Sequence, residues 1–146
     1  MGKIKKIKRV QGLGVLLMIV VIVIIFIFSN QPAQISYSIS DTFASNTNTW
    51  HSPLFSIRKW AHILLFSILG LSAMMTFDKA ILATIFCYFY ACIDEVHQML
   101  IPGRSALFED TLIDALGFGI AIILFQFVKL LYKKRINKSE IGVNEQ

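Results

Sequence analysis

Four long runs of apolar residues dominate this chain of 146 residues. The first, Leu13–Phe28, has sixteen residues without a polar side chain. The other three are Trp60–Phe77, Ala80–Ile101 and Leu107–Val128. A helix of about 20 apolar residues can cross a bilayer, and in lipid only helices and closed barrels satisfy their own backbone hydrogen bonds. The sequence therefore predicts an all-α fold, an integral membrane bundle of about four transmembrane helices.

Composition supports the same class of protein. Hydrophobic residues make up 55% of the chain and charged residues only 16%, whereas a soluble domain carries about 25% charged residues. The length suits a single bundle of short spans, and we assign it to residues 1–128. Residues 129–146 are basic and then polar, and we predict that they form a disordered tail.

The first apolar run has two interpretations. A cleaved signal peptide has an apolar core of about 7–15 residues followed by a cleavage site made of small residues. Here the run is longer, and the segment that follows it, Ser29–Ala33, is a weak site because it contains Asn, Gln and Pro. We therefore interpret the run as an uncleaved first span.

The basic residues predict the orientation. Ten of the fourteen lie near the two ends of the chain: Lys3, Lys5, Lys6, Lys8, Arg9, Lys129, Lys133, Lys134, Arg135 and Lys138. Because Lys and Arg near spans favour the cytoplasm, we expect a multi-pass membrane protein with both termini cytoplasmic. Such flanking charges are typical of topology anchors, so we expect no nucleic-acid partner.

A group of ionisable residues interrupts the apolar pattern at one depth. Three predicted spans contribute to it near their outer ends, and the residues are Arg58, Lys59, His62, Asp94, Glu95, His97, Gln98, Arg104, Asp110 and Asp114. An ionised group inside a bilayer costs at least about 2.5–3.5 kcal/mol, so such groups usually face a bundle interior or a cavity and mark function. The sequence predicts a polar pocket open to the outside above an apolar floor.

Each of these residues also has a purely structural interpretation. His62 could be an interfacial histidine, and Asp94 or Glu95 could pair with Arg104 only to seal the bundle. Asp114 could favour a helix start through the helix dipole. Gly70, Gly117 and Gly119 are expected to permit close contact between helices. Four carboxylates with two histidines at one depth exceed what sealing requires, so we favour a functional pocket.

The spacing of these residues resembles the VanZ-like family of small bacterial membrane proteins. The resemblance runs from about Phe28 to Leu124 and includes Arg58-Lys59-x-x-His62, Asp94-Glu95-x-x-Gln98, Gly103-Arg104 and Asp110-x-x-x-Asp114. It implies a VanZ-like domain over residues 1–128, and the founding member of the family confers resistance to the glycopeptide antibiotic teicoplanin. The chain departs from the family pattern twice, with Leu65 where a carboxylate is common and Asp114 where an asparagine is usual.

Three functions remain open on this basis. In the first, the protein is not an enzyme, and the ligand-binding pocket of Arg58, Lys59, His62, Asp94, Glu95, Gln98, Arg104, Asp110 and Asp114 holds a polar head. That head would belong to a membrane lipid, a lipid-linked cell-wall precursor or a lipophilic glycopeptide, with the bases taking phosphate or carboxylate. No cofactor is expected for this function.

The second function is that of a membrane-embedded hydrolase of lipid-linked substrates. His62, Asp94, His97 and Asp110 would offer metal ligands, and Glu95 would act as the base. The third function is that of an accessory subunit of a wall enzyme or a transporter. The metal content of the purified protein separates the second hypothesis from the first.

Overall fold

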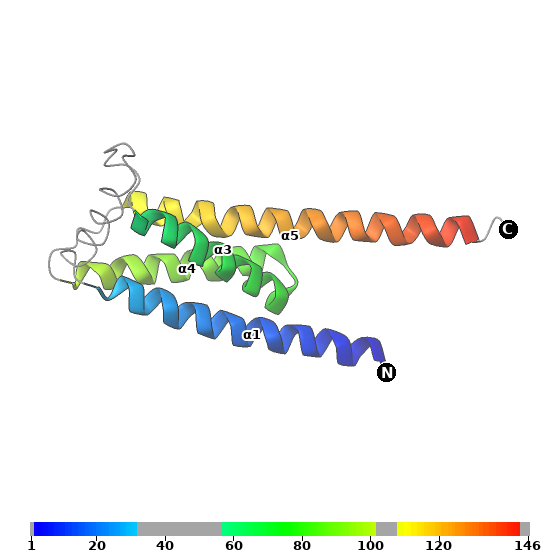
Figure 1. Cartoon of the computed structure of the whole chain (residues 1–146), viewed down its shortest axis with the longest axis horizontal. Helices are drawn as coiled ribbons and strands as arrows, with labels where there is room; N and C mark the ends of the chain where they lie inside the picture. The colour runs from blue at the N-terminus through cyan, green and yellow to red at the C-terminus, as the bar shows by residue number, and fades with distance from the viewer. Residues whose placement is uncertain (1, 32–56, 102–107, 144–146) are drawn as a thin grey trace, which may run out of the picture.

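The computed structural model describes residues 2–31, 57–101 and 108–143, with side chains at 8–31, 59–101 and 109–137. The described chain forms four α-helices: α1 (Gly2–Ser29), α3 (Ile57–Phe77), α4 (Ala80–Met99) and α5 (Phe108–Val143). The helices lie roughly along one axis, as Figure 1 shows. The predicted all-α bundle is confirmed.

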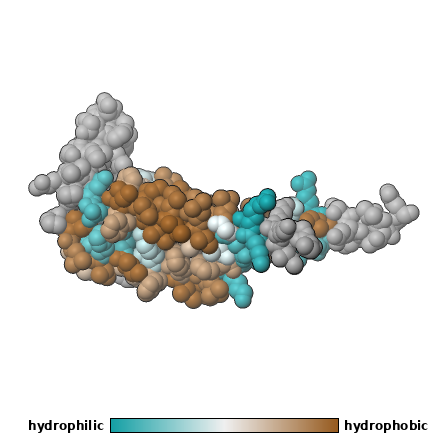
Figure 2. Space-filling view, turned by 90° about the horizontal axis from the view of Figure 1, so that it is seen from below, coloured by the Kyte–Doolittle hydropathy of each residue, from teal (hydrophilic) through white to brown (hydrophobic). Residues whose placement is uncertain are grey.

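All four helices are long and apolar enough to cross a membrane. The candidate spans are Lys8–Ser29, Lys59–Phe77, Ala80–Met99 and Glu109–Asn137. The shortest has 19 residues, which corresponds to about 28 Å of helix. Many large apolar side chains point outwards, and they form a hydrophobic band between hydrophilic ends in Figure 2. Such a surface suits lipid rather than water, so the chain is a multi-pass membrane protein.

The C-terminal segment differs from its prediction. Residues from Lys129 onwards were expected to be disordered, but α5 continues as helix to Val143. The reason is local, because Lys, Arg, Leu and Glu are good helix formers and no Pro or Gly occurs between Lys129 and Ile141. Polarity alone therefore gave a wrong prediction for this segment.

Helix α3 organises the bundle. It contacts each of the other three helices, most extensively α5 and then α1, whereas α1 and α5 do not contact each other within the described residues. Each helix buries one face at intervals of three or four residues, as on α4, where Ala83, Cys87 and Ala91 are fully buried. Tyr90 on α4 donates a hydrogen bond to the carbonyl of Ile22 on α1 at 3.1 Å, which helps to place the first helix within the bundle.

Small residues allow the helix backbones to approach closely. A Cβ at Gly117 on α5 would lie 2.6 Å from the carbonyl oxygen of Ile63, and one at Gly70 on α3 would lie 2.9 Å from that of Phe118. Because lipid is as apolar as the helices, close packing rather than hydrophobic transfer holds such a bundle together. The prediction for Gly119 is wrong, since a Cβ there would meet nothing within 4 Å.

The two ends of the bundle are different. At one end, called here the loop end, α1 and α4 finish and α3 and α5 begin. At the other, the terminal end, lie the two chain termini and the tight turn between α3 and α4 (Figure 1). Asp78 ends α3 there with a φ of 56° and forms an ion pair with Lys129. A short polar residue tolerates this left-handed conformation, so the turn needs no glycine.

Candidate functional site

The buried faces of three helices become polar as they reach the loop end. On α3, His62 lies on the same buried face as Phe66, one turn closer to the loop end. On α5, Asp114 lies on the same buried face as Gly117, again about one turn closer to that end. Asp94 and Gln98 continue the buried face of α4 beyond Ala91. Because side chains three or four residues apart share a helix face, packing of the apolar stripes forces these four polar side chains inwards. We call His62, Asp94, Gln98 and Asp114 the polar cluster.

The closest contact between helices in the polar cluster joins His62 and Asp114. Nδ1 of His62 lies 3.1 Å from Oδ1 of Asp114. The two residues are only 7% and 1% exposed, so water contributes little to solvating them. A carboxylate in such surroundings requires compensation by hydrogen bonds or by positive charge. The imidazole provides at least one such interaction.

Asp94 and Gln98 bring α4 and α1 into the cluster. Nε2 of Gln98 donates a hydrogen bond to Oδ2 of Asp94 at 2.7 Å and lies 3.5 Å from Oγ of Ser29 on α1. Ser29 is the last residue of α1 and is fully buried. All four helices therefore contribute a polar side chain to one place in the bundle. A carboxylate oxygen of Asp94 also lies within 4.8 Å of a ring nitrogen of His62 and of a carboxylate oxygen of Asp114.

A small cavity adjoins the polar cluster. Together with the open solvent at its mouth it comprises about 210 Å³, and it is lined by Lys59, His62, Gln98, Asp110, Ile113 and Asp114. Nζ of Lys59 lies 3.6 Å from Oδ1 of Asp110, which bridges the first turns of α3 and α5. Five of the six lining residues are polar. Most of the surface that these residues present to the cavity is nevertheless apolar, so their polar atoms lie at its edge or behind it.

Aromatic rings close the cluster on the side of the apolar core. The ring of His62 stacks over Phe66 with centroids 6.1 Å apart, and Phe66 in turn contacts Tyr90 at the same distance. Phe66 is completely buried. Packing against Phe66 restricts the orientation of the imidazole ring.

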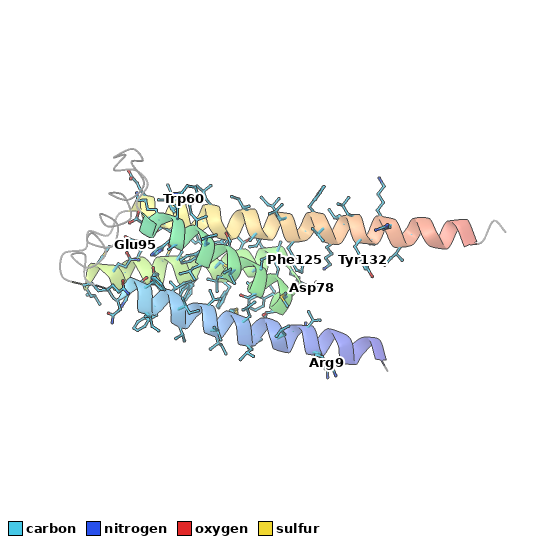
Figure 3. All side chains as sticks on the ribbon, in the orientation of Figure 1. Arg9, Trp60, Asp78, Glu95, Phe125 and Tyr132 are labelled. Carbon is cyan, nitrogen blue, oxygen red and sulfur yellow. The ribbon has the colours of Figure 1, made fainter. Side chains whose placement is uncertain are left out.

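Several of the predicted site residues meet in this place, and others do not. Lys59, His62, Gln98, Asp110 and Asp114 line the cavity, and Asp94 lies directly behind them. Glu95 is buried near the loop end of α4, where Figure 3 labels it, but it is not among the lining residues. Arg104 and the side chain of Arg58 lie outside the described residues, as does the predicted pairing of Arg104 with an acid.

His97 does not join the group that the hydrolase hypothesis required. Its ring stacks on Phe26 of α1 with centroids 4.8 Å apart. The next residue, Gln98, lies on the buried face of α4. Successive residues are about 100° apart around a helix axis, so His97 points away from that face. The group of described His and acidic side chains close enough to hold one ion is instead His62, Asp94 and Asp114.

Sequence reasoning missed two residues of the site. Ser29 is an ordinary serine at the end of an apolar run, and its only signal is its place beside Phe28, where the family resemblance begins. Ile113 lines the cavity as an apolar residue. Its signal is its spacing of three residues from Asp110, which puts both on one side of α5.

Comparison with known proteins gives one match. The family described as VanZ/LLP1 matches residues 14–129, which cover all four candidate spans in whole or in large part. No curated protein and no solved structure matched the chain.

Proposed function

This chain belongs to the VanZ/LLP1 family, and from that premise we propose that it is a binding protein for the polar head of a lipid-anchored molecule. The observation that carries the proposal is the polar cluster, which is buried among four helices and adjoins a cavity lined by polar groups. The ligand would be a membrane lipid, a lipid-linked cell-wall precursor or a lipophilic glycopeptide.

A purely structural role explains the cluster less well. Replacing a buried set of charges by packed apolar residues is often neutral or stabilising, so stability alone gives little reason to keep it. The cavity gives a reason, because the partly buried ion pair of Lys59 and Asp110 borders it, while Asp94 and Asp114 lie deeper. The space beside these side chains is small, far smaller than a site for a drug-sized ligand, which measures about 300–1,000 Å³. The pocket therefore suits a compact head group, and a glycopeptide would enter it only in part.

The proposed ligand reaches the pocket from the outer leaflet. The basic residues Arg9, Lys133, Lys134 and Arg135 lie at or beyond the terminal end, which the positive-inside rule assigns to the cytoplasm. The loop end, with the cavity, then faces outwards. The exposed ring of Trp60 near the loop end suits the headgroup region of that leaflet.

Cysteine labelling in intact cells tests this orientation. We expect an impermeant maleimide to reach a cysteine at Ser40 or Ala106, in the segments before α3 and before α5, and not one at Ser139 near the C-terminus. Both native cysteines, Cys87 and Cys92, are free and need replacement first. Labelling at Ser139 in unbroken cells would place the cavity in the inner leaflet and contradict the proposed access.

Ligand binding is tested directly on the purified protein. We expect native mass spectrometry to find a phospholipid or lipid-linked sugar retained by the parent chain. Gln98→Ala removes a side chain that lines the cavity and holds Asp94, at a cost of about 1–2 kcal/mol, so retention should weaken about five- to thirtyfold. Lys134→Ala, at the terminal end, is the control and should retain the ligand as the parent does. Equal retention by Gln98→Ala would mean that the ligand binds elsewhere.

The same variants test the connection with antibiotics. Production of the parent in a susceptible Gram-positive host is expected to change sensitivity to a lipophilic glycopeptide more than to a hydrophilic one. Gln98→Ala, at equal expression, should abolish the difference, and Lys134→Ala should keep it. A difference that survives Gln98→Ala would favour the accessory-subunit function over the pocket.

A further inference from the structure

Three ionisable side chains from three helices meet in the interior of the bundle. His62 comes from α3, Asp94 from α4 and Asp114 from α5. One imidazole nitrogen and one oxygen of each carboxylate, the atoms that can bind a metal, all lie within 4.8 Å of one another. Their exposed fractions are 7%, 3% and 1%. As long as the helices remain packed, water cannot solvate these three side chains.

The charges of this group require compensation. Two carboxylates this close in a buried site cannot both be ionised unless a positive charge lies between them. Lys59 forms its ion pair with Asp110, one helical turn nearer the loop end, and not with Asp94 or Asp114. Among the described residues, the compensating charge near the acids is then a proton, an imidazolium or a bound cation.

The geometry is compatible with a cation. A first-row divalent metal binds carboxylate oxygen and imidazole nitrogen at about 2.0–2.2 Å, so two adjacent ligands of one ion lie about 3–3.5 Å apart. Nδ1 of His62 and Oδ1 of Asp114 are 3.1 Å apart. Asp94 in addition accepts a hydrogen bond from Gln98 through Oδ2 at 2.7 Å, and ligating carboxylates are commonly hydrogen-bonded in this way.

The cavity supplies the second, independent observation. His62 and Asp114 both line it, so a metal held by the three residues would adjoin a space with room for a further ligand. Sites with three protein ligands typically keep one position open for water or for an oxygen of the bound molecule. An anionic head group, with phosphate or carboxylate oxygens, fits such a position.

We propose that His62, Asp94 and Asp114 form a binding site for one divalent transition-metal ion, with Zn²⁺ as the first candidate and Mn²⁺ as the second. The nitrogen ligand favours these ions over Mg²⁺ and Ca²⁺, which prefer oxygen alone. The site differs from the ligand set expected from the sequence, because Asp114 replaces His97 and Asp110. It does not depend on the proposed lipid binding, since the metal needs no lipid to be measured.

The first test uses the parent protein. We expect detergent-purified protein, incubated with Zn²⁺ and then dialysed, to hold about one metal ion per chain by plasma mass spectrometry. Zn²⁺ at about a hundredfold excess over its dissociation constant should raise the melting temperature of the EDTA-treated protein by about 5–10 °C. Protein that keeps no Zn²⁺ or Mn²⁺ and melts at the same temperature with and without them would overturn the proposal.

The second test compares variants. Asp94→Asn and Asp114→Asn should each lose the bound metal and the shift in melting temperature, while Asp78→Asn, at the terminal end, should keep both. If a proton compensates the acids instead, either substitution relieves repulsion and the metal-free melting temperature is unchanged or higher, without any response to Zn²⁺ in the parent. Unchanged metal content in both variants would place the ion elsewhere.

The two proposals fail separately. Lipid retention without metal would overturn the metal site and leave the proposed function intact. Metal binding without lipid retention would overturn the proposed function and leave the metal site intact.

Discussion

His62→Leu is expected to lower the free energy of unfolding by about 1–3 kcal/mol, the cost of leaving a buried polar group without its hydrogen-bond partner. The imidazole contacts Asp114 at 3.1 Å, and both residues are almost inaccessible to water. Leucine fills a similar volume above Phe66, so lost packing contributes little. What remains is two buried carboxylates, Asp94 and Asp114, without the imidazole. Equilibrium unfolding in mixed micelles, followed by circular dichroism, measures the change.

His97→Leu is the matched control. His97 also lies near the loop end, but its ring stacks on Phe26, and its Nε2 is buried without a hydrogen-bond partner among the described residues. Loss of one aromatic pair costs about 0.5–1.5 kcal/mol, and removal of an unsatisfied nitrogen offsets part of it. If the two substitutions proved equally destabilising, the contact between His62 and Asp114 would not be the important one.

Gly117→Ala is expected to lower the free energy of unfolding by about 1–3 kcal/mol, as overpacking typically does. The added Cβ would lie 2.6 Å from the carbonyl oxygen of Ile63 and 3.2 Å from its carbonyl carbon. These are backbone atoms, so α3 and α5 must separate. Separation also weakens the hydrogen bond from Oγ of Ser67 to the carbonyl of Gly117, now 3.0 Å. Thermal unfolding in detergent measures the effect.

The same substitution should disturb the polar cluster. Gly117 is three residues from Asp114 on α5, and Ile63 follows His62 on α3, so moving the helices apart lengthens the contact between His62 and Asp114. Gly119→Ala is the control, because its Cβ would meet nothing within 4 Å. That change should be neutral or stabilising by up to about 1 kcal/mol, since alanine favours helix over glycine. A loss at Gly119 as large as at Gly117 would contradict close packing as the cause.

The helices were predictable because two simple signals agreed. The apolar runs predicted spans beginning near Trp60 and Ala80, and the structure has candidate spans from Lys59 and Ala80. The turn at Asp78-Lys79 follows from adjacent charged residues between two apolar runs. The extension of α5 to Val143 was missed because the prediction used polarity, whereas helix formation in that segment depends on the propensity of its residues.

The candidate site was predictable in its depth but not in its contacts. Positions along the chain showed that Lys59, Asp94 and Asp114 lie near one end of their spans, because each residue advances a helix by a fixed rise. They did not show which side chains face each other. His97 and Gln98 are neighbours in sequence, yet Gln98 contacts Asp94 inside the cluster while His97 packs on α1.

The class of fold, the four spans and the family follow from apolar length and motif spacing, which are properties of the chain alone. The meeting of His62, Asp94 and Asp114 depends on tertiary packing, as does the position of Gly117 rather than Gly119 against a neighbouring helix. The physical reason is rotation about the helix axis. Which residues of a helix face inwards depends on how its small and large side chains fit those of the other helices, and no single helix contains that information.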